Sequence, residues 1–392
     1  MALAAGVKGG PYLWVLIQYY RHAQATAPRE PGAIADWRQE FGDPDALLAS
    51  YARGEDNATA ERLVAMAKPL GIELQGLLAG QFDATPFYKY VTDEAATRAG
   101  APPDAPSGGV RAFLDAHEPE LIAVVDELTT ADAPVWKCDI SSVVPQSSVS
   151  LLGVHILNSV LASEALAKAS RGWTKDADRT MRAAWALMRS IRGQPQMIGE
   201  FAGMRLATTD TEVVRHLDVD PAVWRPMLGE YDYPAAFERS VEVEAAVRLR
   251  ADGASSMTAR AFRADYLDGM RANLLHTRTV SLTDAPSALQ DMNTLPMSEP
   301  GREVALIAGP GLDRGRQAAQ GVMLDFELTD RVLEARQEKT KTGRWPDALP
   351  NVASAQVPGA EWVYATDADG VISISLNRTL PSYLQLKFEA HR

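Results

Sequence analysis

Residues 151–170 read LLGVHILNSVLASEALAKAS, and this stretch decides the fold. Apolar residues line one helical face at Val154, Leu157 and Leu161, and others cover the opposite face. A helix that is apolar on nearly every side is buried inside a protein. The sequence therefore predicts a central helix over residues 151–170 that other helices surround.

Glycine and proline divide the sequence that follows this helix. Gly172 predicts a turn, and Thr174 is an N-cap residue for a second helix of amphipathic spacing. Gly193 and Pro195 end the second helix and start a third one. Helices joined by such tight turns form antiparallel hairpins. We therefore expect a mainly α fold with tetratricopeptide-like stacking of helical hairpins.

Composition limits the class of protein. A chain of 392 residues suggests one large domain or two modest ones, and its 46% hydrophobic content predicts a sizeable core. The formal net charge of -12 argues against a nucleic-acid partner, because phosphate binding relies on clustered Lys and Arg. Cys138 is the only cysteine, which excludes an internal disulfide and a cysteine-based zinc site.

The N-terminal segment, residues 1–28, is apolar and aromatic. Its run Tyr12-Leu-Trp-Val-Leu-Ile-Gln-Tyr-Tyr20 is shorter than the about 20 residues that span a bilayer, but its aromatic residues are typical of a membrane interface. Three interpretations stay open: the stump of an anchor, the remnant of a signal peptide with small residues around Ala23-Gln-Ala25, and a helix packed on the body. The first two predict membrane association through the N-terminus and a location in the cell envelope, either periplasmic or membrane-anchored. The cytoplasm is the alternative.

The rest of the chain divides into three further regions. They are an irregular, short-helical region at 29–109, a helical core at 110–300, and a long helix with a β-hairpin module at 301–392. Within the last region a helix is expected at about 317–341. The period then changes from helical to alternating, with a turn at Asp367-Ala-Asp-Gly370. The sequence thus predicts a small C-terminal β-hairpin module on a helical protein.

This C-terminal region resembles a known class of proteins. A long helix, then Gly343-Arg-Trp-Pro346-Asp-Ala-Leu349, then a hairpin is similar to the body of type II secretion pseudopilins and other pilin-like proteins. The helical middle ending Gly193-Gln-Pro-Gln-Met-Ile198, together with this tail, resembles a group of membrane-anchored bacterial envelope proteins of uncharacterised function. A pilin has its hydrophobic stem at the N-terminus, whereas the stem-like helix here follows most of the chain. The resemblance therefore implies an envelope protein but not pilus assembly.

No motif of the chain predicts a metal or a cofactor. The six histidines stand in no metal-binding spacing, and the sequence has no P-loop and no Gly-x-Ser-x-Gly elbow. Gly309-Pro-Gly-Leu-Asp-Arg-Gly315 loosely suggests a dinucleotide loop, but it lacks a βαβ setting. We therefore expect neither a bound cofactor nor a metal site.

Two groups of polar residues are candidates for an active site. His155, Ser159 and Ser163 form a polar stripe on the central helix, where a histidine serves either as a catalytic base or as a structural group. Glu200 and Arg205 lie on the third helix, where an ion pair between helices explains them as well as catalysis does. In an enzyme, we expect His155 as the base and Glu200 as its orienting group or as the acid.

Two functions from different classes follow. The first is a non-catalytic, envelope-associated helical protein that binds a protein partner through a helical groove. The alternative is a helical hydrolase or lyase that acts on a small or lipophilic substrate in an interhelical pocket. A closed pocket at His155 and Glu200 favours the enzyme, and an open apolar groove favours the binding protein.

Overall fold

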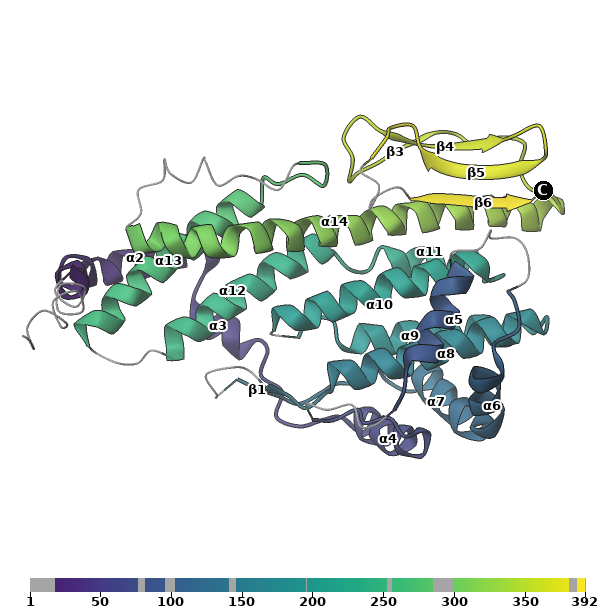
Figure 1. Cartoon of the computed structure of the whole chain (residues 1–392), viewed down its shortest axis with the longest axis horizontal. Helices are drawn as coiled ribbons and strands as arrows, with labels where there is room; N and C mark the ends of the chain where they lie inside the picture. The colour runs from purple at the N-terminus through teal and green to yellow at the C-terminus, as the bar shows by residue number, and fades with distance from the viewer. Residues whose placement is uncertain are drawn as a thin grey trace, which may run out of the picture.

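The computed structural model describes residues 18–76, 82–95, 103–140, 146–194, 196–251, 256–284, 299–380 and 386–391. It confirms the predicted class, a mainly helical protein with a small C-terminal antiparallel sheet (Figure 1). The helices of the first half are η1 (Ala27–Arg29), α2 (Glu30–Phe41), α3 (Pro44–Ala49), α4 (Ala58–Ala67), η2 (Lys68–Leu70), α5 (Thr85–Ala95), α6 (Gly108–Ala116) and α7 (Glu118–Thr130). The later helices are α8 (Leu151–Ser170), α9 (Thr174–Ser190), α10 (Met197–His216), α11 (Pro221–Leu228), α12 (Tyr233–Ala251), α13 (Met257–Thr277) and α14 (Glu299–Thr342). The strands are β1 (Cys138–Asp139), β2 (Gln146–Ser147), β3 (Val352–Ala353), β4 (Glu361–Thr366), β5 (Val371–Leu376) and β6 (Lys387–His391).

The central helix α8 begins and ends where its sequence predicts. The hydroxyl oxygen of Ser150 accepts a hydrogen bond from the Gly153 N–H at 3.1 Å, which satisfies one free donor of the first turn. Gly172 follows the helix with a φ of 78°, a left-handed conformation that glycine adopts without strain. The chain then returns as α9, which packs along α8. These two helices form the predicted hairpin.

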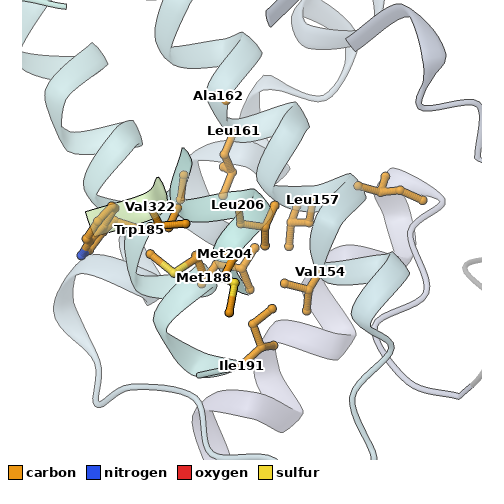
Figure 2. Close-up of a cluster of buried hydrophobic side chains, with 14 of the residues drawn as sticks. Val154, Leu157, Leu161, Ala162, Trp185, Met188, Ile191, Met204, Leu206 and Val322 are labelled. Atoms are coloured by element: carbon orange, nitrogen blue, oxygen red, sulfur yellow. The ribbon is translucent and has the colours of Figure 1, made fainter. Parts of the chain in front are cut away.

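The core brings together side chains from helices that are distant in sequence. Figure 2 shows Leu157 of α8, Met188 of α9 and Met204 of α10 in one cluster, which Val322 of α14 joins. All four side chains are buried. Burying one such side chain contributes about 1.5–3 kcal/mol, so clusters of this kind dominate the stability of the helical body.

The long helix α14 differs most from the sequence prediction. It spans 44 residues, Glu299–Thr342, instead of the expected 317–341. Gly309–Gly315, which only loosely suggested a dinucleotide loop, lies inside this helix. Helix α14 packs against α10, α11, α12 and α13 and runs along the long dimension of the molecule (Figure 1). Pro310 falls inside α14, where a proline costs about 3 kcal/mol.

Buried arginines tie α10 to α14. Arg336 of α14 donates to the carbonyl of Val214 at 2.9 Å and also to the carbonyls of Arg215 and Leu217. It thereby caps the C-terminal end of α10. Arg215 in turn forms an ion pair with Asp325 at 2.8 Å. The tetratricopeptide-like stacking is not confirmed, because α10 packs against this long helix rather than continuing a regular series of hairpins.

The C-terminal module is a sheet of the order β3-β4-β5-β6, in which neighbouring strands are antiparallel. Strands β4 and β5 are the predicted hairpin, and the carboxylate of Asp367 accepts hydrogen bonds from the Asp369 and Val371 N–H groups at the turn. The sequence analysis missed β3 and β6. The buried side chains of the sheet pack on α14, including Trp362 against Leu328 in one apolar cluster.

One carboxylate joins the sheet to α14. Glu327 accepts hydrogen bonds from the Ser354 hydroxyl at 2.7 Å, the Ala355 N–H at 2.9 Å, the Gln356 N–H at 3.2 Å and the Trp362 Nε1–H at 2.8 Å. Hydrogen bonds to a charged acceptor contribute about 1.5–3 kcal/mol each. Glu327 therefore fixes the start of the sheet against the helix.

The described N-terminal part is helical over residues 18–26, then forms η1 and α2, and packs on α13. The carboxylate of Glu30 pairs with Arg260 at 2.6 Å and with Arg263 at 2.5 Å. Most of the apolar run Tyr12–Tyr20 lies outside the described residues, so the anchor and the signal peptide stay predictions. Among the helices that the structure does describe, none is both long and apolar enough to cross a bilayer.

The division of the chain into four regions, at 1–28, 29–109, 110–300 and 301–392, also stays a prediction.

Candidate functional site

His155 lies where α5 crosses α8. Its ring centroid is 4.9 Å from that of Tyr88, and the two rings are tilted against each other. Burial lowers the pKa of the His155 imidazole, and the guanidinium of Arg205 lowers it further, so the ring is neutral at pH 7. The hydroxyl of Ser159 donates to the backbone carbonyl of His155 at 2.9 Å and not to its ring. This hydrogen bond ties the Ser159 hydroxyl to the backbone of its own helix.

Glu200 lies at the start of α10 and is only 2% exposed. Its carboxylate accepts hydrogen bonds from the Gly193 N–H at 2.9 Å and from the Tyr231 hydroxyl at 3.0 Å. Burial raises the pKa of Glu200, and these two hydrogen bonds oppose that rise. The carboxylate thus links the turn after α9 to the segment that precedes α12.

The structure does not join the two predicted residues into one site. Both lie in the described part of the chain, and no hydrogen bond or ion pair there connects His155 to Glu200. His155 contacts α5, whereas Glu200 holds the turn between α9 and α10. A base that needs an orienting carboxylate has none in hydrogen-bond reach here.

The sequence analysis missed an aromatic box around Arg192. The guanidinium carbon lies 5.1 Å from the ring centroid of Trp185, 4.7 Å from that of Tyr231 and 5.2 Å from that of Tyr233. The Nε–H of Arg192 also donates to the Tyr233 hydroxyl at 3.1 Å. Because the chain's own cation fills the box, the arrangement explains stability at the C-terminal end of α9. Only tertiary contact reveals it, since the tyrosines come from a different segment.

A second buried polar pair lies deeper in the body. The side-chain amide of Asn158 donates to the Ala184 carbonyl at 3.0 Å and to the Asp210 carboxyl at 3.3 Å. Both Asn158 and Asp210 have no solvent exposure. Burial raises the pKa of Asp210 to about 8, so this carboxyl is mostly neutral at pH 7. A neutral pair sealed in the core has a structural role.

We searched the described segments for side chains that could bind a metal ion. Within them, no group of three or more His, Cys, Asp or Glu side chains is arranged to hold a metal ion. Cys138 is a buried free thiol, and burial raises its pKa, which keeps it protonated and unreactive.

An open groove lies elsewhere, where α11 and α14 meet the edge of the sheet. Its volume is about 410 Å³. We call it the β3 groove, and its apolar and charged lining includes Arg225, Leu228, Met323, Phe326, Val352 and Trp362. Arg225 pairs with Asp330 through two hydrogen bonds of 2.7 and 3.0 Å at the rim. No sequence signal marks this groove, because β3 has two residues and its register is set by tertiary contacts.

Comparison with known proteins adds no further guide to function. Searches of protein families, of characterised proteins and of solved structures find no match to this chain.

Proposed function

We propose that this chain is a non-catalytic helical protein of the cell envelope that binds a protein partner in the β3 groove. The observation that carries the proposal is the groove itself, an open concavity with an apolar floor at Met323 and Phe326. Val352 at its edge is 41% exposed, although it stands in a sheet with a buried inner face. Contiguous exposed apolar surface with a polar rim is typical of interaction sites.

The enzyme alternative has less support. A hydrolase or lyase using His155 and Glu200 needs both side chains at one substrate-sized cleft. The ring of His155 instead packs at a tilt against Tyr88, and Glu200 accepts hydrogen bonds from Tyr231 and Gly193. These separate structural partners account for both residues without chemistry.

The envelope location rests on the residues of the N-terminal segment and on the resemblance of the tail to pseudopilin bodies. The sheet lies along the C-terminal part of α14, directly after the long helix (Figure 1). This helix-then-sheet arrangement supports the resemblance, which the sequence carries at Gly343–Leu349. Membrane association through residues 1–28 belongs to the same proposal. A protein partner, rather than a nucleic acid, agrees with the net charge of -12.

A photo-crosslinking amino acid at Val352 tests the proposal in cells that express the chain. The matched control places it at Glu361, which is exposed on the opposite face of the sheet. We expect one protein, identified by mass spectrometry, to crosslink at position 352 and not at 361. Equal products at both positions, or none at 352, would contradict partner binding in the groove.

A further inference from the structure

The register of the sheet leaves part of β3 without a neighbour. Strand β3 is at the edge of the sheet, and the Ser354 N–H donates to the Ala360 carbonyl at 2.9 Å, toward the β4 side. Residues of an antiparallel strand alternate in the direction of their backbone hydrogen bonds. Val352 therefore also bonds toward β4, whereas the N–H and C=O of Ala353 point outward.

The outward groups of Ala353 are available for pairing. Ala353 is exposed, and outside the β3–β4 ladder no hydrogen bond among the described residues reaches its main chain. An edge strand with free N–H and C=O groups is a template for another strand. Proteins commonly protect such an edge by keeping the strand very short, by covering it, or by placing charged residues or proline on it. Strand β3 is short, with two residues, but it is not covered. Val352 and Ala353 provide neither charge nor proline.

The groove lies where an added strand would place its side chains. Val352 stands directly opposite Trp362, so both side chains project from the face of the sheet that packs on α14. A strand beside β3 would continue this face over the end of α11. Its alternate side chains would then meet Leu228, Met323 and Phe326, which line the β3 groove.

The charges of the groove are already balanced within the chain. Arg225 pairs with Asp330, and Arg331 donates to the Pro350 carbonyl at 2.7 Å and pairs with Glu334. The carboxylate of Glu327 serves its four donors from the sheet and the loop after β3. The Arg331 Nε–H has no hydrogen-bond partner, but it is buried, so a charged side chain placed in the groove would lose water without reaching it. Charge complementarity therefore favours an uncharged occupant.

From these observations we infer that the occupant of the β3 groove is an extended, uncharged segment of a protein partner, which adds to the sheet as a fifth strand at Ala353. The inference rests on the proposed function and names the conformation of the partner. Backbone pairing provides affinity, and pockets for alternate side chains provide selectivity, as in other cases of strand addition.

The test uses short peptides selected from a displayed random library on the folded full chain. Ala353→Pro removes the outward N–H, and proline is tolerated at an edge strand whose N–H faces solvent. Ala353→Val keeps the N–H and is the matched control. Thermal unfolding verifies that both variants fold. We expect the selected peptides to be uncharged, with apolar residues at alternate positions. They should bind Ala353→Pro about tenfold more weakly than the original chain and bind Ala353→Val with the same affinity.

Other results overturn the inference in distinguishable ways. Some selected peptides should lose binding to Met323→Glu, which shows that they occupy the groove. If these peptides bind Ala353→Pro as tightly as they bind the original chain, strand addition is excluded. Such a result would leave groove binding itself intact. A selection that yields no peptide sensitive to Met323→Glu would overturn the inference too. Absence of the crosslink at Val352 in cells would contradict the proposed function and, with it, this inference.

Discussion

Asp210 is the single residue at which pH acts most directly on this fold. Burial raises its pKa from the ordinary 3.8 to about 8, so the folded state retains a proton that the unfolded state releases. The contribution of this protonated carboxyl to the free energy of unfolding is fully present below pH 4 and is lost as the pH rises through 8. The opposite holds for a carboxylate that gains an ion pair on folding.

Asp210→Asn removes this titration while keeping an acceptor for Asn158. We expect the variant to match the original chain near pH 4 and to exceed it by about 1–3 kcal/mol in free energy of unfolding at pH 9. Urea unfolding at the two pH values measures the difference. The same pH dependence in both proteins would show that the buried carboxyl does not govern it.

The sequence located candidate residues better than it located their partners. His155 and Glu200 were placed correctly on the central and third helices, since helical spacing depends on local sequence. Their contacts, Tyr88 and Tyr231, come from other segments of the chain. Local periodicity carries no information on such pairs. The groove was missed for the same reason.

At the scale of the elements, Gly315 sets how closely α14 approaches α12. A Cβ atom at Gly315 would overlap the ring of Phe237, whereas one at Gly311, on the same helix, would meet nothing within 4 Å. We expect Gly315→Ala to lower the free energy of unfolding by about 1–3 kcal/mol through overpacking. Gly311→Ala should raise it by up to about 1 kcal/mol through helix propensity. Thermal unfolding compares the pair, and equal effects would rule out the close approach.

Glu327 governs the junction between α14 and the sheet. Glu327→Ala leaves four donors without their acceptor, and we expect a loss of about 2–4 kcal/mol with faster hydrogen exchange in β3 and β4. Glu338→Ala, which removes an exposed ion pair with Lys341 on the same helix, should cost less than about 1 kcal/mol. Unchanged exchange in β3 and β4 of Glu327→Ala would contradict this role.

The elements that the sequence missed share a physical cause. Strand β3 is too short to show alternation, and α14 continues through Pro310, where the local sequence favours a break. By contrast, α8 was predicted to the residue, since its apolar spacing and its stop Gly172 are local signals. Boundaries set by local chemistry were therefore predictable, and those set by packing were not.

At the scale of the whole molecule, ion pairs hold the N-terminal part on α13. Glu30 is 8% exposed and pairs with two arginines, so Glu30→Gln leaves Arg263, which is nearly buried, without its carboxylate. We expect faster hydrogen exchange in α2 and a loss of about 1–3 kcal/mol. The control is Asp93→Asn, whose partner Lys89 is exposed. Equal exchange in both variants would show that these ion pairs do not retain the segment.

The class of the fold was predictable and its arrangement was not. Apolar spacing and turn residues were enough to predict a mainly helical chain with a terminal sheet. The packing of α14 along the hairpins depends on contacts such as the hydrogen bond from Arg336 to the Val214 carbonyl, which join segments far apart in sequence. We propose that the β3 groove on this assembled surface binds a protein partner and that His155 has a structural role.

One comparison tests that claim most directly, the yield of the Val352 crosslink in cells carrying Met323→Glu or His155→Gln. Met323→Glu places a charge on the floor of the groove, and His155→Gln removes the imidazole at α5. Both proteins are first shown to fold by circular dichroism. We predict that the crosslink is lost in Met323→Glu and retained in His155→Gln. Retention in Met323→Glu together with loss in His155→Gln would contradict the account.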